Sequence, residues 1–263
     1  MKFDKLEELN IPSKNKLFIG YKGKSKFFIK EYTFRKGLEK EDLGKMRREV
    51  LCYRNVKSLN LPKLIKTNFK QRQVIYEFIE NFKPMGKISK KMIDKIINLY
   101  ITQIITANPG SLPKINYDYY GGSLYKRAKN VHRNGLLPSF TKIYEKFKQN
   151  KDLINKSTKY FSHGDLTTYN LLYMDKKLVP NDFEHSAIDN GMYDLSCLFV
   201  ELYGRKRLRT HLYKKIKNLK FFNKKLFDLM VYRRCIEVMF WLQHKPKLQH
   251  FKNTKELIKS WDI

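Results

Sequence analysis

The sequence predicts an α+β protein with two parts, a small antiparallel sheet followed by a larger helical region. Before residue 80, short apolar runs alternate with polar turns, a pattern that is typical of antiparallel strands. After residue 88, apolar residues recur at spacings of three and four, which indicates amphipathic helices. The 263 residues, of which 42% are hydrophobic, suffice for one large domain or for two small lobes around a cleft.

The first part is expected to contain one helix between its third and fourth strands. This helix runs from about Gly37 to Ser58, because Met46, Val50 and Tyr53 recur there on one side of a helix. Polar residues and turns separate the strands from one another. The strands are predicted at residues 6–11, 17–21, 26–32, 61–66 and 73–79.

The second part opens with a helix that Ser89 can cap. Apolar residues from Met92 to Ile105 follow at helical spacing, and an Asn-Pro-Gly sequence at residues 108–110 ends the helix. Further helices are predicted near residues 123–134, 139–150, 193–203, 209–218, 224–244 and 254–261.

The chain is strongly basic, with 55 Lys and Arg against 25 Asp and Glu and a net charge of +30. Such a charge attracts nucleic acid, anionic lipid headgroups or phosphorylated glycans, and it repels polycations. Basic residues concentrate at residues 205–225, within the helical region. Contact with an anionic membrane surface or with nucleic acid is therefore one interpretation, and a compositional bias toward Lys, Ile, Asn, Tyr and Phe is the other.

No apolar run approaches the roughly 18 residues that a membrane-spanning helix needs, so no transmembrane segment is expected. The charged first ten residues do not have the pattern of a signal peptide. Cys52, Cys197 and Cys235 are unevenly spaced and form no C-x-x-C motif, so neither a disulfide framework nor a zinc site is predicted. A reducing, cytoplasmic location is the expectation.

Residues 162–184 carry the strongest functional signal. They contain an H-G-D-x-x-x-x-N motif, with Asp165 and Asn170, and then a D-F-E motif that begins at Asp182. The intervening apolar residues flank a polar turn, which predicts a β-hairpin whose far end delivers Asp182 beside the first motif. Phosphoryl transfer needs such a set, because one carboxylate accepts the proton of the attacking hydroxyl while an amide and a second carboxylate hold magnesium.

This pattern resembles the catalytic centre of the aminoglycoside phosphotransferase and choline kinase superfamily, the small-molecule branch of the protein-kinase-like fold. The resemblance implies a two-lobed structure, with a β-rich N-lobe at residues 1–80 and a helical C-lobe at residues 81–263. It implies ATP and Mg²⁺ as cofactors, with Asp165 as the catalytic base and with Asn170 and Asp182 as magnesium ligands. By the same resemblance, His163 and Asp194 brace the catalytic loop.

The resemblance also implies a nucleotide site in the N-lobe. Lys30, in F-F-I-K-E-Y, matches the lysine that contacts the α and β phosphates, and Glu49 is its expected partner, with Glu41 as the alternative. The phosphate-covering loop would be residues 12–16, which contain no glycine, so that Ser13, Asn15 or lysine side chains would assist the backbone amides. At the hinge, Tyr76 would be the gatekeeper, and the backbone of Glu77 and Ile79 would bond the adenine.

Two details favour a small-molecule kinase over a protein kinase. The metal motif ends in Glu184 where protein kinases have glycine, and only eleven residues separate Asp182 from Asp194, too few for a peptide-binding segment. The expected acceptor is a hydroxyl of a neutral or anionic small molecule, a sugar or a lipid-linked glycan. The resemblance implies that the C-terminal helices line the acceptor pocket, with Tyr232, Glu237 and Trp241 as candidate contacts. The alternative for Tyr232 and Trp241 is a place in the core.

Two alternatives remain open from the sequence. The H-G-D-L-T-T-x-N sequence is also close to the catalytic loop of the Bud32 family of small atypical protein kinases and ATPases, although the chain after the metal motif is longer than that minimal fold needs. A catalytically silent kinase-like module that binds nucleic acid or an anionic membrane is the other, and the intact set of Asp165, Asn170 and Asp182 disfavours it.

Overall fold

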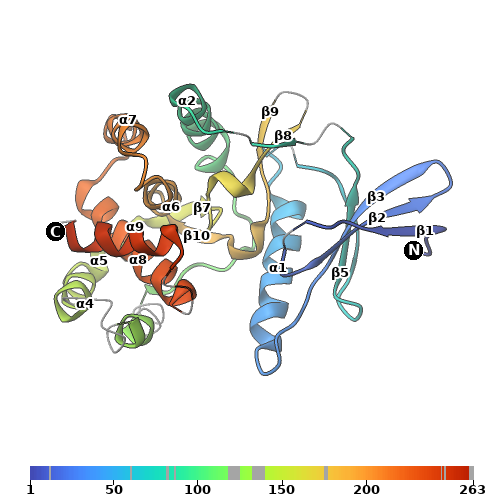
Figure 1. The fold of residues 1–263 in the computed structure, drawn as a ribbon, viewed down its shortest axis with the longest axis horizontal. Coiled ribbons are helices and arrows are strands. Elements are labelled where there is room, and N and C mark those ends of the chain that lie inside the picture. Colours follow the sequence, from blue (N-terminus) through green and yellow to red (C-terminus); the bar gives the residue numbers. More distant parts are fainter. Residues whose placement is uncertain are drawn as a thin grey trace.

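A sheet-rich part and a helix-rich part lie side by side in the protein, as the computed structural model shows (Figure 1). The N-terminus lies at the outer edge of the sheet, and helix α9 (Gln249–Ser260) lies at the opposite end of the molecule (Figure 1). The α+β fold class is therefore confirmed. The structure describes residues 1–11, 13–59, 61–80, 83–85, 87–117, 125–131, 140–174, 177–243, 245 and 247–260.

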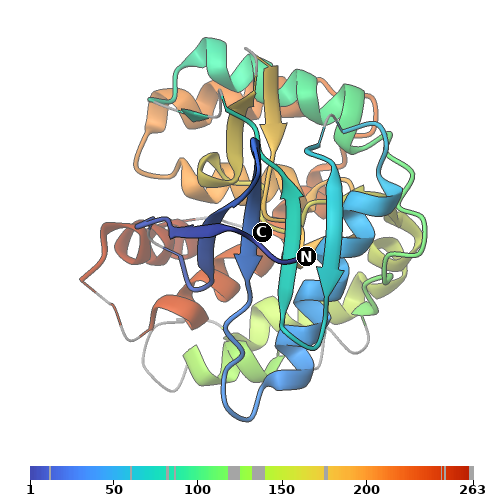
Figure 2. The same ribbon diagram turned by 90° about the vertical axis from the view of Figure 1, so that its right-hand side faces the viewer.

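The sheet-rich part contains a five-stranded sheet with the strand order β1-β2-β3-β5-β4, and all its neighbouring strands are antiparallel. Strand β3 is central, and Lys30 lies near its end, opposite Val74 of β5. Figure 2 shows the sheet in front of the helices. Its strands are β1 (Lys5–Glu8), β2 (Lys16–Lys22), β3 (Ser25–Glu31), β4 (Leu64–Asn68) and β5 (Gln73–Glu77).

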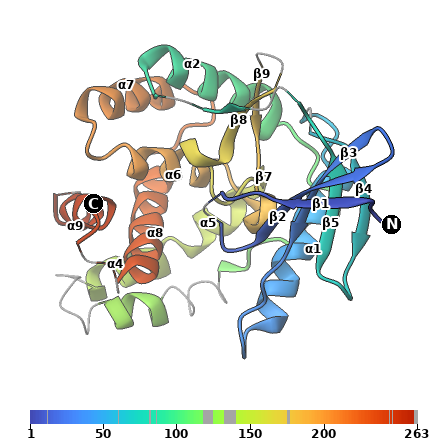
Figure 3. The same ribbon diagram turned by 45° about the vertical axis from the view of Figure 1, so that its right-hand side comes forward.

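Helix α1 (Glu39–Asn55) lies between this sheet and the helix-rich part (Figure 3). On one side, Met46 and Val50 pack with Val74 and Tyr76 in a small apolar core. On another side, the helix contacts the turn that follows Asp182. Helix α1 therefore links the sheet to the catalytic segment.

Two small sheets carry the catalytic segment. Strands β8 (Leu171–Met174) and β9 (Lys177–Pro180) form the predicted hairpin, and β6 (Lys83–Pro84) pairs with β8. Strands β7 (Thr158–Ser162) and β10 (Ala187–Asn190) pair antiparallel on either side of the two motifs. The sequence did not predict β7 and β10, because both are short and contain polar residues.

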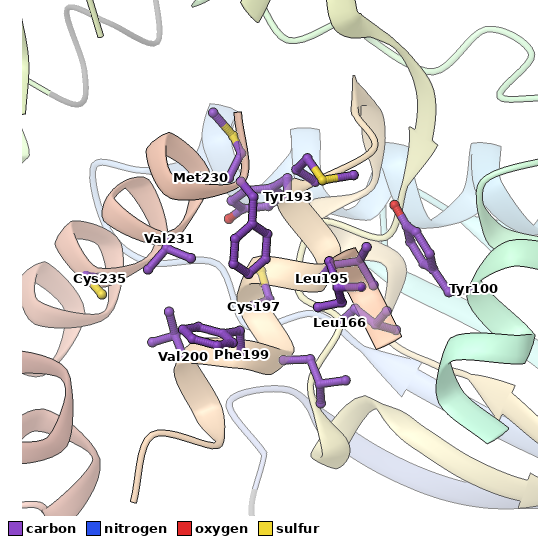
Figure 4. Packing of buried hydrophobic residues seen from close by; sticks show 14 of the residues in the cluster. Tyr100, Leu166, Tyr193, Leu195, Cys197, Phe199, Val200, Met230, Val231 and Cys235 are labelled. Atoms are coloured by element: carbon purple, nitrogen blue, oxygen red, sulfur yellow. The ribbon is translucent and has the colours of Figure 1, made fainter. Parts of the chain in front are cut away.

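The helices share one large core, in which α6 is almost entirely buried and packs against α8. Figure 4 shows the side chains of these two helices meeting, with Tyr193 near Met230. Within the described ranges, each helix is too short or too polar to cross a lipid bilayer. The helices are α2 (Lys90–Leu99), which continues into a π-helical turn (Tyr100–Ile104), α4 (Phe140–Gln149), α5 (Lys151–Ser157), α6 (Tyr193–Glu201), α7 (Lys206–Lys217) and α8 (Lys224–Leu242).

Several predicted boundaries need correction. The first strand was predicted to end at residue 11 but ends at Glu8, and the fourth was predicted to begin at residue 61 but begins at Leu64. The residues between lie outside the paired register with the neighbouring strand. Helix α5 was not predicted. The cap at Ser89 is confirmed, since its hydroxyl accepts the N–H of Met92 at 3.2 Å. Part of the helix predicted at residues 123–134, and Trp261, lie outside the described residues.

Candidate active site

Buried hydrogen bonds hold the loop that carries Asp165. Asp194, at the start of α6, is fully buried and accepts the N–H of His163 at 2.8 Å and the N–H of Gly164 at 2.9 Å. It also accepts the hydroxyl of Ser162 at 2.9 Å. Burial raises the pKa of Asp194, while these three donors fix the orientation of the carboxylate. Asp194 therefore braces the loop, as predicted.

Gly164 is required where the loop crosses the second motif. Its φ of 81° lies in the left-handed region, and a Cβ atom there would lie 2.1 Å from the carbonyl oxygen of His185. Only glycine fits such a close backbone approach. The two motifs are thereby held in contact.

His163 joins the same two motifs through its ring. Its Nδ1 accepts the N–H of Asp165 at 3.3 Å, so Nε2 carries the proton and donates to the carbonyl oxygen of Asn181 at 2.8 Å. The ring is fully buried, with its centroid 4.8 Å from that of Phe183. The segment before Asp182 is thus tied to the loop of Asp165.

Asp165 accepts bonds on both carboxylate oxygens. The amide nitrogen of Asn170 donates to Oδ2 at 3.0 Å and to the backbone carbonyl of Asp165 at 2.8 Å. Arg234, on α8, donates from Nη2 to Oδ1 at 2.6 Å. Burial alone raises the pKa of Asp165, but the charge of Arg234, with smaller contributions from two histidines, outweighs it and holds the pKa below its usual value. Asp165 is therefore an ionised carboxylate.

Asp182 has a left-handed backbone, with φ 65° and ψ 67°, which is uncommon for a residue other than glycine. The next residue, Phe183, is fully buried, and its ring contacts that of Tyr53 on α1 at a centroid distance of 5.6 Å. The strained backbone turns the Asp182 carboxylate toward the sheet, where Oδ1 accepts Lys30 Nζ at 2.7 Å. Such strain is characteristic of functional sites.

Lys30 also donates to Glu49 of α1 at 2.7 Å, so one ammonium joins the sheet, the helix and the catalytic segment. Glu49 is 2% exposed and accepts the hydroxyls of Tyr32 and Tyr76 as well. Burial alone lowers the pKa of Lys30, but the carboxylates, mainly Glu49, raise it well above its usual value. The lysine remains charged, and Glu41 pairs instead with Arg35 and Lys45.

Glu184 of the D-F-E motif is buried beneath the loop at residues 13–16. Its Oε1 pairs with Lys14 and lies 3.2 Å from His185 Nε2, while its carbonyl oxygen accepts Arg48 Nε at 2.8 Å. Burial alone raises the pKa of Glu184, but His185 and two lysines hold it well below its usual range. Lys14 therefore connects this loop to the catalytic segment.

Ser13 and Asn15 have local partners. Ser13 Oγ accepts the N–H of Asn15 at 3.1 Å, and the buried Asn15 side chain accepts the N–H of Thr33 at 3.2 Å. These bonds shape the loop where β2 begins and β3 ends. A nucleotide role for either side chain stays a prediction.

The predicted hinge follows β5. Tyr76 is buried and its hydroxyl is bonded to Glu49, while the N–H of Glu77 donates to the carbonyl of Lys63 at 2.8 Å within the sheet. Ile79 lies two residues beyond the end of β5 and is partly buried. The adenine contacts of Glu77 and Ile79 stay predictions.

The C-terminal candidates separate into two kinds. Glu237 is 1% exposed and accepts Tyr193 and Arg233, so it belongs to a buried network and not to an open acceptor surface. Tyr232 is also buried. Trp241, in contrast, is 38% exposed and lies beside the catalytic segment, with its ring 6.2 Å from that of His185.

The donor set suits a magnesium ion. Asn170 commits its amide nitrogen to Asp165, so the ligand that it could offer is the amide oxygen. Asp182 is 35% exposed and supplies a carboxylate. Hard oxygen donors of this kind, few in number and completed by substrate phosphates, are the usual protein ligands of Mg²⁺.

Comparisons with solved structures define the fold to which this site belongs. Choline kinase LicA from Streptococcus pneumoniae aligns over 98% of this chain and 93% of its own, with a TM-score of 0.64 and 15% identity. A thermostable mutant of aminoglycoside phosphotransferase APH(4)-Ia, in a ternary complex with ADP and hygromycin B, aligns over 98% of this chain and 92% of its own, with a TM-score of 0.68 and 8% identity. Macrolide 2'-phosphotransferase type I aligns over 96% of this chain and 90% of its own, with a TM-score of 0.60 and 10% identity.

The chain therefore has the protein-kinase-like fold of small-molecule kinases. The resemblance inferred from the H-G-D and D-F-E motifs is confirmed at the level of the fold. No family model matches the sequence, and no curated protein matches it either.

Proposed function

We propose that this protein is a kinase that transfers the γ-phosphoryl group of ATP to a hydroxyl of a small molecule. The observation that carries the proposal is the pair of bonds from Lys30 Nζ to Glu49 and to Asp182, both 2.7 Å. They bring together the lysine proposed to bind phosphate and the carboxylate proposed to bind the metal. The neighbouring folds of choline, aminoglycoside and macrolide kinases support the same chemistry.

In the proposed reaction, the acceptor oxygen forms a bond to the γ-phosphorus while the bond from that phosphorus to the bridging oxygen breaks, and ADP leaves. Asp165 orients the hydroxyl and takes its proton late in a loose transition state, for which a weakly basic carboxylate suffices. Lys30 contacts the α and β phosphates. Asn170 and Asp182 would hold Mg²⁺, which neutralises phosphate charge when bound.

The acceptor is proposed to be neutral or anionic, such as a sugar or a lipid-linked glycan. The net charge of +30 repels polycations, and the base itself lies beside Arg234. The basic residues at 205–225 would attract an anionic surface that carries the acceptor. Added salt would weaken this attraction.

The test is a panel of sugars, amino alcohols, glycans and a generic protein substrate, incubated with ATP and Mg²⁺. Phosphorylated products are identified by mass, and ADP is quantified in parallel. We expect at least one small hydroxyl compound to be phosphorylated, with the reaction lost in EDTA. Phosphorylation of polypeptide alone would instead support an atypical protein kinase, and nucleotide hydrolysis without any product would support an ATPase.

A further inference from the structure

Arg234 is a buried arginine whose hydrogen-bonding capacity is only partly used. It is 6% exposed, and its Nη2 bonds Asp165. Its Nε and Nη1 are buried and have no hydrogen-bond partner within the described part of the chain. A guanidinium presents five N–H donors, and a buried donor without a partner is costly. Such a group in a native structure calls for an explanation.

The preceding residue provides a matched comparison. Arg233 is also buried, but its Nη1 donates to Asp189 at 2.8 Å and to Tyr117 at 2.6 Å, and its Nε donates to Glu237 at 3.3 Å. Arg233 therefore belongs to a completed structural network. Two neighbouring arginines of one helix thus differ, and the incomplete one is the arginine that bonds the predicted catalytic base.

The place of Arg234 connects it to the acceptor. A hydroxyl that bonds Asp165 lies next to the oxygen that Arg234 holds at 2.6 Å, so a substituent close to that hydroxyl falls near the guanidinium. The Asp165 side chain is 28% exposed, whereas that of Arg234 is 7% exposed. Trp241 covers the guanidinium at 5.4 Å and is itself partly exposed, so an arriving group would replace part of this contact.

We propose that Arg234 is a specificity-determining residue that binds a carboxylate or phosphate group of the acceptor, next to the hydroxyl that Asp165 orients. Arginine forms charge-assisted, often paired hydrogen bonds with both groups. An anion would satisfy Nε and Nη1, and the guanidinium would then bridge the base and the acceptor. This inference rests on the proposed kinase activity and narrows its substrate class to anionic hydroxyl compounds.

The test compares acceptors that differ in one group: glycerol, glycerate and glycerol 3-phosphate, and likewise glucose, glucuronate and glucose 6-phosphate, with choline as a cation. Steady-state kinetics are measured for the parent, Arg234→Ala, Arg234→Lys and the control Lys259→Ala, which removes an exposed charge from the neighbouring helix α9. Within the glycerol set or the glucose set, we expect the parent to have its highest kcat/KM for an anionic member. Whether carboxylate or phosphate is preferred identifies the group.

Arg234→Ala should raise the KM of the preferred anionic acceptor by roughly 10-fold to 100-fold, leaving the KM of ATP nearly unchanged. Arg234→Lys should recover part of the loss, and Lys259→Ala should behave as the parent. Preference for neutral acceptors, or an equal fall in kcat for every acceptor with no change in KM, would overturn the inference while leaving the kinase activity standing. Absence of any phosphorylated product would overturn both.

Discussion

The two sides of the candidate active site differ in how completely their charges are paired. On the nucleotide side, Lys30 bonds Glu49 and Asp182, and the hydroxyls of Tyr32 and Tyr76 complete the Glu49 carboxylate. On the acceptor side, Arg234 bonds Asp165 through one nitrogen, while two others lack partners among the described residues. The Lys30–Glu49 pair is thus completed by bonds within the protein, while Glu184 Oε2 lacks a partner among the described residues. We propose that a ligand completes the hydrogen bonds of Arg234.

This difference follows from what each side must recognise. Phosphate groups and magnesium are the same for every ATP-dependent kinase, so their ligands can be fixed by buried bonds between sheet, helix and hairpin. An acceptor varies between kinases, and specificity arises when buried polar groups of the site are satisfied only by the correct substrate. Changes on the nucleotide side should therefore affect folding and catalysis together, whereas changes on the acceptor side should affect catalysis more than folding.

The largest effect is expected for Asp182→Ala, which removes a magnesium ligand and a partner of Lys30. Turnover should fall by roughly 1,000-fold or more, corresponding to about 4 kcal/mol. Magnesium should then no longer strengthen ATP binding, as measured by calorimetry with and without EDTA. A variant that kept magnesium-dependent affinity would remove Asp182 from the metal site.

Glu49→Gln should come next, because it leaves Lys30 buried with one carboxylate partner fewer. Breaking a buried pair typically costs about 3–5 kcal/mol, and we expect the lower end since Asp182 remains. Urea unfolding measures the loss. The matched control is Glu41→Gln on the same helix, where the half-exposed Glu41 pairs with the half-exposed Arg35 and with Lys45, which keeps Asp42 as a partner. This change should cost less than about 1 kcal/mol. Equal losses of unfolding free energy in the two variants would mean that the buried Lys30–Glu49 pair stabilises the protein no more than the Glu41 pairs do.

Gly164→Ala should destabilise the contact between the two motifs. The new Cβ would overlap the carbonyl of His185 and hold a positive φ, at a cost of about 2 kcal/mol or more. Gly37→Ala is the control, since Gly37 has a similar φ of 79° but no atom within 4 Å of the added Cβ. The difference between the two melting temperatures isolates the overlap, and no difference would argue against close contact of the motifs.

Tyr76→Phe should have the smallest of these effects. It removes one hydroxyl donor from the Glu49 carboxylate, at a cost of about 1–2 kcal/mol in urea unfolding. Tyr169→Phe is the stability control, because Tyr169 is 84% exposed and its substitution should change little. Indistinguishable variants would indicate that the Tyr76 hydroxyl contributes nothing to the Glu49 network.

The sequence predicted the geometry of the catalytic segment and of the Lys30–Glu49 pair better than that of the C-terminal helices. Asp165 and Asn170 precede one hairpin and Asp182 follows it, so their spacing predicts that they meet, and Lys30 and Glu49 lie in adjacent elements. Strands β7 and β10 were missed because each finds its partner across the whole catalytic segment. Several observed element boundaries differ from the predicted ones by a few residues. Polar residues flank these elements, and such residues are compatible both with the element and with the adjoining loop.

Arg234 was also missed, although its sequence context contained a signal. Two adjacent arginines lie among apolar residues in the middle of the helix, and buried charges require partners. Which carboxylate each would find could not be predicted, because Arg234 and Asp165 are 69 residues apart in the chain. A pair of this range depends on how α8 packs, and periodicity alone does not specify that packing.

The most direct test of the account is the Asp165→Asn variant, measured for both turnover and nucleotide binding. The base acts on the acceptor, so phosphorylation of the best acceptor should fall by about 100-fold to 10,000-fold while the Kd for magnesium-ATP stays close to that of the parent. Asp152→Asn, which alters an exposed carboxylate on α5, should match the parent in both measurements. Parental turnover in Asp165→Asn, or a loss of ATP affinity as large as the loss of turnover, would contradict the assignment of Asp165 as the base.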